Sequence, residues 1–157
     1  MSAHAAWDAD FASSLIKPHL GTEGPLLPIL HDLQAAFGYV PEAAVPMVAE
    51  ALNLSRAEVH GVVTFYHDFR HAPAGRHVLK LCRAEACQAA GGDALVARAE
   101  AKLGCTMGDT SADGRVTLEA IYCLGLCSVS PSAMLDGKIH ARLDDKKLDA
   151  LIAQAEQ

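Results

Sequence analysis

The chain has 157 residues, which is the size of one ordinary domain or of a compact domain with a smaller attachment, so a hydrophobic core can form. Its residues are 51% hydrophobic and 20% charged, and no apolar run approaches the roughly 18 residues that are needed to cross a bilayer. The net charge is -6 and the 13 lysine and arginine residues are spread along the chain, which argues against direct binding of nucleic acid.

Residues 1–10 lack both a basic segment and an apolar segment, so no secretory signal is expected and the predicted location is the cytoplasm. Structural disulfides are rare in a reducing compartment. The five cysteines therefore indicate metal ligation or redox chemistry.

The first half of the chain has helical periodicity. The expected helices are 7–17, 26–37 with Gly38 as its C-cap, 41–52, and a fourth that opens with a capping box at Ser55–Glu58. Residues 1–72 are therefore predicted to form a helical segment, and residues 72–75, which contain Pro73 and Gly75, are the predicted linker.

The second half, residues 76–157, mixes strands and helices. The expected elements are a strand at 77–81, a helix that follows Gly91-Gly92 with Asp93 as a possible N-cap and ends at Gly104, a strand at 116–122, a hairpin of 132–135 with 138–142, and a last helix capped by Asp144 or Asp145. The first strand, helix and second strand form a βαβ unit with parallel strands. The predicted fold class is α/β, with an N-terminal helical bundle followed by a thioredoxin-like α/β domain.

Four cysteines occur as two short pairs, Cys82 with Cys87 (C-x4-C) and Cys123 with Cys127 (C-x3-C). Each pair follows one strand of the βαβ unit, and parallel strands end at the same edge of a sheet, so the pairs can meet. Four thiolates suit a 2Fe-2S cluster, which needs two for each iron. Structural zinc also accepts four thiolates at such spacings, so the spacing leaves a zinc-stabilised binding module as an alternative.

Other cysteine chemistries fit the sequence less well. No C-x-x-C occurs, which argues against thioredoxin-type thiol exchange, although a thiol oxidoreductase remains a third class. A plant-type ferredoxin would need a cysteine where Ala90 stands, and a Rieske centre would need histidines in these loops. Cys105 has no near cysteine and is expected to be a small buried hydrophobe.

His67 and His71 are four residues apart and could share a helix face as metal ligands, with His60 a turn or two upstream, but no third ligand is evident. Surface or interface positions are the favoured interpretation. Arg83 and Glu85 lie inside the first cysteine loop, where charge would tune a cluster's potential, and two solvated side chains are the alternative.

With the cysteines placed, the whole chain resembles the thioredoxin-like 2Fe-2S subunit family of respiratory complex I, NAD-reducing hydrogenases and NAD-dependent formate dehydrogenases. The motifs in the first half are Leu26–Gln34, Gly38–Pro41, and Val63–Tyr66 with Phe69. Those in the second half are the C-x4-C loop, Asp113-Gly114, and Cys123–Cys127 followed by Pro131. The resemblance favours iron and sulfide over zinc. It implies that Cys82 and Cys87 bind one iron and Cys123 and Cys127 the other.

Within this family, the segments Phe65–Arg70 and Cys82–Gln88 look most like the gamma subunit of molybdenum-containing, NAD-dependent formate dehydrogenase. The resemblance implies an electron-transfer subunit that docks on a flavin- and NAD-binding subunit and exchanges single electrons with its FMN. NAD and FMN are then expected on the partner. An equivalent subunit of an NAD-reducing hydrogenase or of complex I is the alternative. The aromatic residues of the Phe65–Phe69 segment suit a helical core or a partner interface equally.

Overall fold

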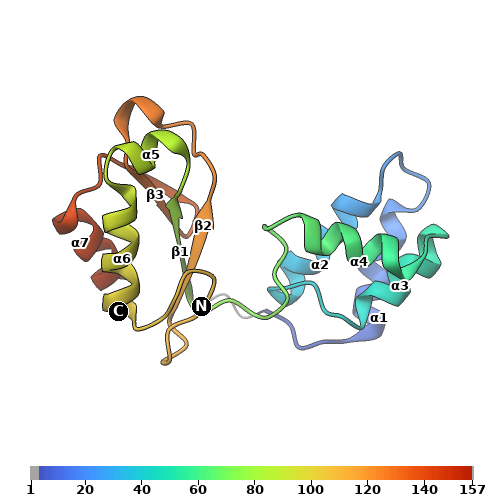
Figure 1. The fold of residues 1–157 in the computed structure, drawn as a ribbon. Helices are drawn as coiled ribbons and strands as arrows, with labels where there is room; N and C mark the ends of the chain where they lie inside the picture. The colour runs from blue at the N-terminus through green and yellow to red at the C-terminus, as the bar shows by residue number, and fades with distance from the viewer. Residues whose placement is uncertain (1–3, 157) are drawn as a thin grey trace. The chain divides into compact units, whose positions relative to one another are not determined.

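The computed structural model describes residues 4–156. The chain forms two compact units, of which the first ends at Pro73 and the second begins at Ala74, inside the predicted linker (Figure 1). Residues 1–3 of the predicted helical segment, and Gln157, lie outside the described residues. No described helix combines the length and the apolar character that a membrane crossing requires.

The described part of the first unit is helical. Its elements are α1 (Ala9–Ile16), the 3₁₀ helix η1 (Lys17–His19), α2 (Leu26–Phe37), α3 (Ala44–Leu52) and α4 (Arg56–Phe65). The predicted bounds of α2 are confirmed, because Gly38 takes the left-handed conformation at its C-cap and donates its N–H to the Gln34 carbonyl. The capping box at Ser55 is also confirmed, since the Ser55 and Glu58 side chains each bond the other's backbone N–H.

The predicted start of α3 is wrong by three residues. Pro41 lies in a turn before the helix, and its carbonyl accepts the N–H of Ala44 at 2.9 Å, so regular helix begins only at Ala44. The apolar faces of these helices form one hydrophobic cluster. It includes Leu30 and Leu33 of α2, Val48 of α3 and Val59 of α4, all completely buried.

The second unit contains a four-stranded sheet. Its elements are β1 (His77–Cys82), α5 (Glu85–Ala89), α6 (Gly92–Leu103), β2 (Val116–Ile121), the 3₁₀ helix η2 (Cys127–Val129), β3 (Ser132–Leu135), β4 (Lys138–Ala141) and α7 (Asp145–Ala155). The strand order is β2-β1-β3-β4. β1 and β2 are parallel, as the βαβ prediction requires, and β3 pairs antiparallel with both β1 and β4.

Helices α6 and α7 lie side by side against the sheet (Figure 1). Alternate strand residues such as Leu79 and Leu118 point into this layer and are completely buried with Leu148 of α7. Asp144 is the N-cap of α7, one of the two predicted caps. Asp93 is not the N-cap of α6; Gly91, at φ +91°, takes that position and Asp93 forms an ion pair with Arg83 at 3.3 Å.

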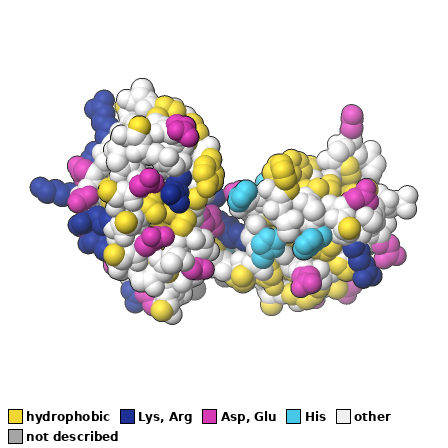
Figure 2. Space-filling model, viewed as in Figure 1, with side chains coloured by type: hydrophobic (Ala, Val, Ile, Leu, Met, Phe, Trp, Pro, Cys, Tyr) yellow, Lys and Arg dark blue, Asp and Glu magenta, His cyan; other side chains and the backbone are white. Residues whose placement is uncertain are grey.

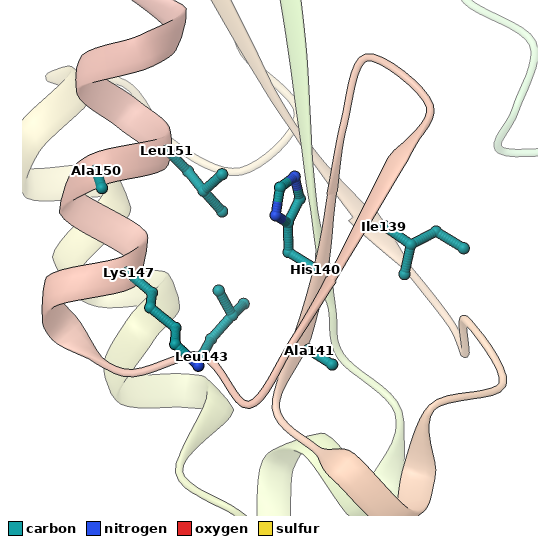
Figure 3. A pocket seen from close by; sticks show the side chains of 7 residues that line it. All are labelled: Ile139, His140, Ala141, Leu143, Lys147, Ala150 and Leu151. Carbon is teal, nitrogen blue, oxygen red and sulfur yellow. The ribbon is translucent and has the colours of Figure 1, made fainter.

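A hollow of about 400 Å³ lies between β4 and α7. Figure 3 shows His140 and Leu151 pointing into this space from opposite sides, while Ile139 points away from it. Its lining is mostly apolar, and the Nε2 atom of His140 is buried without a hydrogen-bond partner among the described residues. Burial and the charge of Lys138 lower the pKa of His140, so the neutral imidazole is favoured.

Candidate metal centre

The two cysteine loops meet at one edge of the sheet. Cys82 is the last residue of β1, not the first residue after it, and pairs with Ile121 at the end of β2. The N–H of Arg83 donates to the Ile121 carbonyl at 2.8 Å, so the first loop is tied to the second strand. Cys123 follows two residues after Ile121. Parallel pairing therefore brings both loops to the same place, at the end of the unit where α5 lies (Figure 1).

The first loop contains a short helix that the sequence analysis missed. Cys87 lies on α5, where its N–H and that of Gln88 both donate to the Ala84 carbonyl at 3.0 Å. The sequence signal was the alanine-rich composition of this loop, since alanine has the highest helix propensity. The helix turns the Cys87 side chain inward, and Cys87 is 2% exposed. Cys82, at the end of β1, is 4% exposed.

The second loop presents its cysteines differently. Cys123 and Cys127 are both exposed, with their sulfur atoms 3.7 Å apart. Cys123 has φ +91°, a left-handed conformation that residues with a side chain rarely adopt. The N–H of Gly125 donates to the Cys123 sulfur at 3.3 Å. Uncommon backbone of this kind is concentrated at functional sites, which supports a binding role for the loop.

Backbone N–H groups stabilise the anion of Cys82. Burial opposes ionisation of this thiol, but hydrogen bonds from the Ala84 backbone and from the Cys87 thiol favour the thiolate. Further bonds from the backbone of Cys123 and Leu124 add to them, and the balance lowers the pKa of Cys82. The second loop therefore contributes directly to the environment of the first cysteine.

The pKa of Cys127 is shifted in the opposite direction, upward. Its hydrogen bond with Cys123 and the charge of Cys123 raise its pKa, and burial and the charge of Cys87 raise it further. Thiolates held this close repel one another. A cation bound among them removes that repulsion, and metal binding is what releases the protons. Four thiols with backbone N–H donors are thus a donor set that fits an iron-sulfur cluster.

Within residues 4–156, no group of three or more histidine, cysteine or acidic side chains surrounds a point where a single metal ion would sit. His60, His67 and His71 therefore do not form such a group. All three side chains are exposed, in keeping with the surface interpretation, and Figure 2 shows histidine side chains on the viewed surface of the helical unit. The four cysteines likewise do not surround a point for one metal ion; they lie near one another as two pairs, one from each loop.

Cys105 lies apart from these loops and packs against the core of the second unit. It is half-buried, and burial raises the pKa of its thiol, as do the charges of Asp109 and Glu100. Arg83 is paired with Asp93, so the charge that would act on the cysteines is partly neutralised. The aromatic segment of the first unit is divided: Phe69 is 4% exposed, whereas Phe65 is 72% and Tyr66 43% exposed.

Comparison with known proteins identifies the class. The thioredoxin-like 2Fe-2S ferredoxin family matches residues 12–156, and the chain belongs to this family. The predicted family and the predicted fold class are thereby confirmed. A solved NAD⁺-reducing NiFe-hydrogenase in the air-oxidised state aligns with 83% of the chain at a TM-score of 0.70 and 27% identity. The aligned region is 22% of that hydrogenase chain.

The chain is also similar to curated subunits of larger enzymes. It is 37% identical over 111 residues to one subunit of the NADH-quinone oxidoreductase of Pseudomonas aeruginosa, covering 71% of this chain and 67% of that one. It is 31% identical over 132 residues to the NADP-reducing hydrogenase subunit HndA of Solidesulfovibrio fructosivorans, covering 84% and 77%. The corresponding NADH-quinone oxidoreductase subunit of Escherichia coli K12 is 36% identical over 123 residues, covering 78% and 74%.

Proposed function

We propose that this chain is an electron-transfer subunit in which Cys82 and Cys87 bind one iron of a 2Fe-2S cluster and Cys123 and Cys127 bind the other. The observation that carries the proposal is the meeting of the two cysteine pairs at one sheet edge. Membership of the 2Fe-2S ferredoxin family supports the choice of iron and sulfide over zinc.

The residues of the chain contribute binding and electrostatics. When bound, the cluster would accept and return one electron at a time. The backbone N–H groups around Cys82 favour its thiolate, which is the form that binds metal. The buried pair, Cys82 and Cys87, excludes water, whereas Cys123 and Cys127 face solvent or a partner. The exposed pair gives electrons a short route into and out of the protein.

The proposed partner is a flavin- and NAD-binding subunit that exchanges electrons with the cluster through FMN. The names of the relatives support this assignment, since they are subunits of NADH-quinone oxidoreductase and of NADP-reducing hydrogenase. For the parent enzyme we propose a cytoplasmic, molybdenum-containing, NAD-dependent formate dehydrogenase, on the resemblance of segments Phe65–Arg70 and Cys82–Gln88. The alternative is the equivalent subunit of an NAD-reducing hydrogenase or of complex I.

The cluster assignment is tested by replacing one cysteine inside the site and one outside it. Cys87→Ala should abolish the visible absorbance and the electron paramagnetic resonance (EPR) signal of the reduced protein, and should release iron and sulfide. Cys105→Ala should retain both, because Cys105 packs elsewhere. Wild-type protein that contains zinc and no sulfide, or a Cys105→Ala variant that loses the cluster, would contradict the assignment.

The parent enzyme is tested by purifying the tagged chain from its native cells with its bound subunits. The purified complex is assayed for NAD⁺ reduction with formate and with hydrogen, and for NADH oxidation with a quinone. Formate activity together with molybdenum supports the formate dehydrogenase assignment. Activity only with hydrogen or quinone would replace it with the corresponding alternative.

A further inference from the structure

Ser132 is a buried hydroxyl group at the candidate metal centre, outside the four cysteines. Its Oγ atom lies 3.5 Å from the sulfur of Cys87. Both residues are 2% exposed, so the contact is shielded from water. Buried hydroxyl groups in folded proteins almost always have a hydrogen-bond partner, and here that partner is the Cys87 sulfur.

The fold holds this contact in place. Ser132 is the first residue of β3, and the next residue, Ala133, pairs with Leu81, one position before Cys82. On its other side Ser132 pairs with Ala141 of β4. Cys87 is positioned by α5, which also contacts η2 of the second loop. Sheet and helix therefore fix the two atoms independently of each other.

Metal binding determines the direction of the hydrogen bond. In the free thiol either atom can be the donor. A thiolate bound to iron has no proton, so the serine hydroxyl must then donate and the sulfur must accept. Removal from water strengthens such a bond, because the local dielectric constant is low.

We propose that Ser132 donates a hydrogen bond to the Cys87 thiolate and thereby raises the reduction potential of the cluster. The proposal rests on the proposed function. Reduction adds negative charge to the cluster, and a donor to a ligand sulfur stabilises the more negative state. Ser132 is thus a positioning and tuning residue, whose hydroxyl acts through Cys87 and touches no substrate.

The test compares Ser132→Ala with Ser111→Ala. The control also removes a buried hydroxyl from the second unit, but Ser111 bonds the N–H of Val116 at the start of β2, the end remote from the cysteines. Potentiometric titration followed by EPR is expected to give a more negative midpoint potential for Ser132→Ala and an unchanged one for Ser111→Ala. Ser132→Thr, which keeps the hydroxyl, is expected to return the potential toward that of wild type.

A second readout detects the proton itself. After exchange into D₂O, pulsed EPR of reduced wild type should show a deuteron coupling that is lost in Ser132→Ala and kept in Ser111→Ala. If Ser132→Ala does not fold, the deuteron coupling of wild type is compared with that of Ser132→Thr, which keeps the hydroxyl, and absence of the coupling in both counts against the hydrogen bond. Equal potentials for wild type and Ser132→Ala, or equal shifts for Ser132→Ala and Ser111→Ala, would overturn the proposal. Wild type without a 2Fe-2S signal would instead overturn the proposed function, on which this inference depends.

Discussion

At the scale of single residues, the two cysteine pairs differ in burial and in backbone conformation. Cys82 and Cys87 are both buried, and backbone N–H groups surround the sulfur of Cys82. Cys123 has a left-handed backbone and lies exposed beside Cys127. The buried pair is therefore fixed by packing, and the exposed pair depends on the conformation of a loop.

Gly92 is a residue whose replacement should disturb the buried pair. A Cβ atom at this position would lie 2.6 Å from the carbonyl oxygen of Cys87. We expect Gly92→Ala to destabilise the second unit by about 1–3 kcal/mol, as overpacking does, and to weaken retention of the cluster. Urea unfolding and iron content measure the two effects.

The matched control is Gly61→Ala in α4, where a Cβ atom would meet nothing within 4 Å. Alanine is favoured over glycine inside a helix by about 0.5–1 kcal/mol, so this change should stabilise the protein. If Gly92→Ala were as well tolerated as Gly61→Ala, the close approach of the α6 start to Cys87 would be wrong.

His140 should make folding stability depend on pH. Its folded-state pKa is lower than the ordinary value of 6.5, because it is partly buried and near Lys138. The unfolded chain therefore binds a proton first, and stability should fall as the pH drops below about 6.5 and level off below the folded pKa. His140→Phe should remove this loss of stability at low pH. Near pH 8 the stability of the variant should be unchanged or higher, since Nε2 of His140 has no hydrogen-bond partner among the described residues. Urea unfolding across this pH range decides the matter, and an unchanged slope in the variant would contradict the prediction.

At the scale of elements, helices α6 and α7 are joined by a charge cluster on their exposed side. Arg98 of α6 donates to both carboxylate oxygens of Asp149 on α7, at 2.8 and 2.7 Å, and Lys102 lies 3.0 Å from the same carboxylate. These bonds hold the pKa of Asp149 well below its ordinary value, chiefly through the side chain of Arg98.

Asp149→Asn should therefore lower the midpoint of thermal unfolding at neutral pH. A carboxylate with a depressed folded-state pKa contributes stability above its unfolded pKa, near 3.8, and that contribution is lost as the pH falls below this value. The variant and wild type should converge in strong acid and at high salt, which screens exposed charges. A double-mutant cycle with Arg98→Gln isolates the pair, and strictly additive effects of the two changes would show that they do not interact.

At the scale of the whole molecule, residues 4–156 form two hydrophobic cores, one made from residues of the helical unit and the other from residues of the sheet unit. The second core supports the cysteine loops, because β1 and β2 supply both its centre and the strand ends from which the loops leave. Loss of packing there should therefore reach the candidate metal centre.

Leu79→Ala tests the packing of the core beneath the cysteine loops. Leu79 is completely buried in β1, so its truncation should cost about 2–5 kcal/mol and increase amide exchange along β1 and β2. Ile139→Ala, at a position that is 51% exposed, serves as the control and should cost far less. Equal exchange in the two variants would contradict the position of Leu79 at the centre of the core.

Features that depend on neighbouring residues could be predicted from the amino-acid sequence. The bounds of α2, the capping box at Ser55 and the stop of α6 at Gly104 follow from local hydrogen bonds and backbone preferences. The parallel β1–β2 pair was predictable from the strand, helix, strand order, and the cysteine spacing then indicated a metal centre. The assignment of the four cysteines as ligands stays a prediction of the sequence, which the geometry supports.

Which groups lie around those cysteines depends on tertiary packing alone. Helix α5 is too short to be stable by itself and forms where the chain packs around Cys87. Asp93 was the predicted N-cap, but α6 begins at Gly92, so Asp93 lies in the first turn, where its carboxylate pairs with Arg83 of the first cysteine loop. The contact of Ser132 with Cys87 joins residues 45 positions apart and has no signal in the local pattern. The packing of the sheet and its helices determines such contacts, since side chains distant in sequence meet only after the chain has folded.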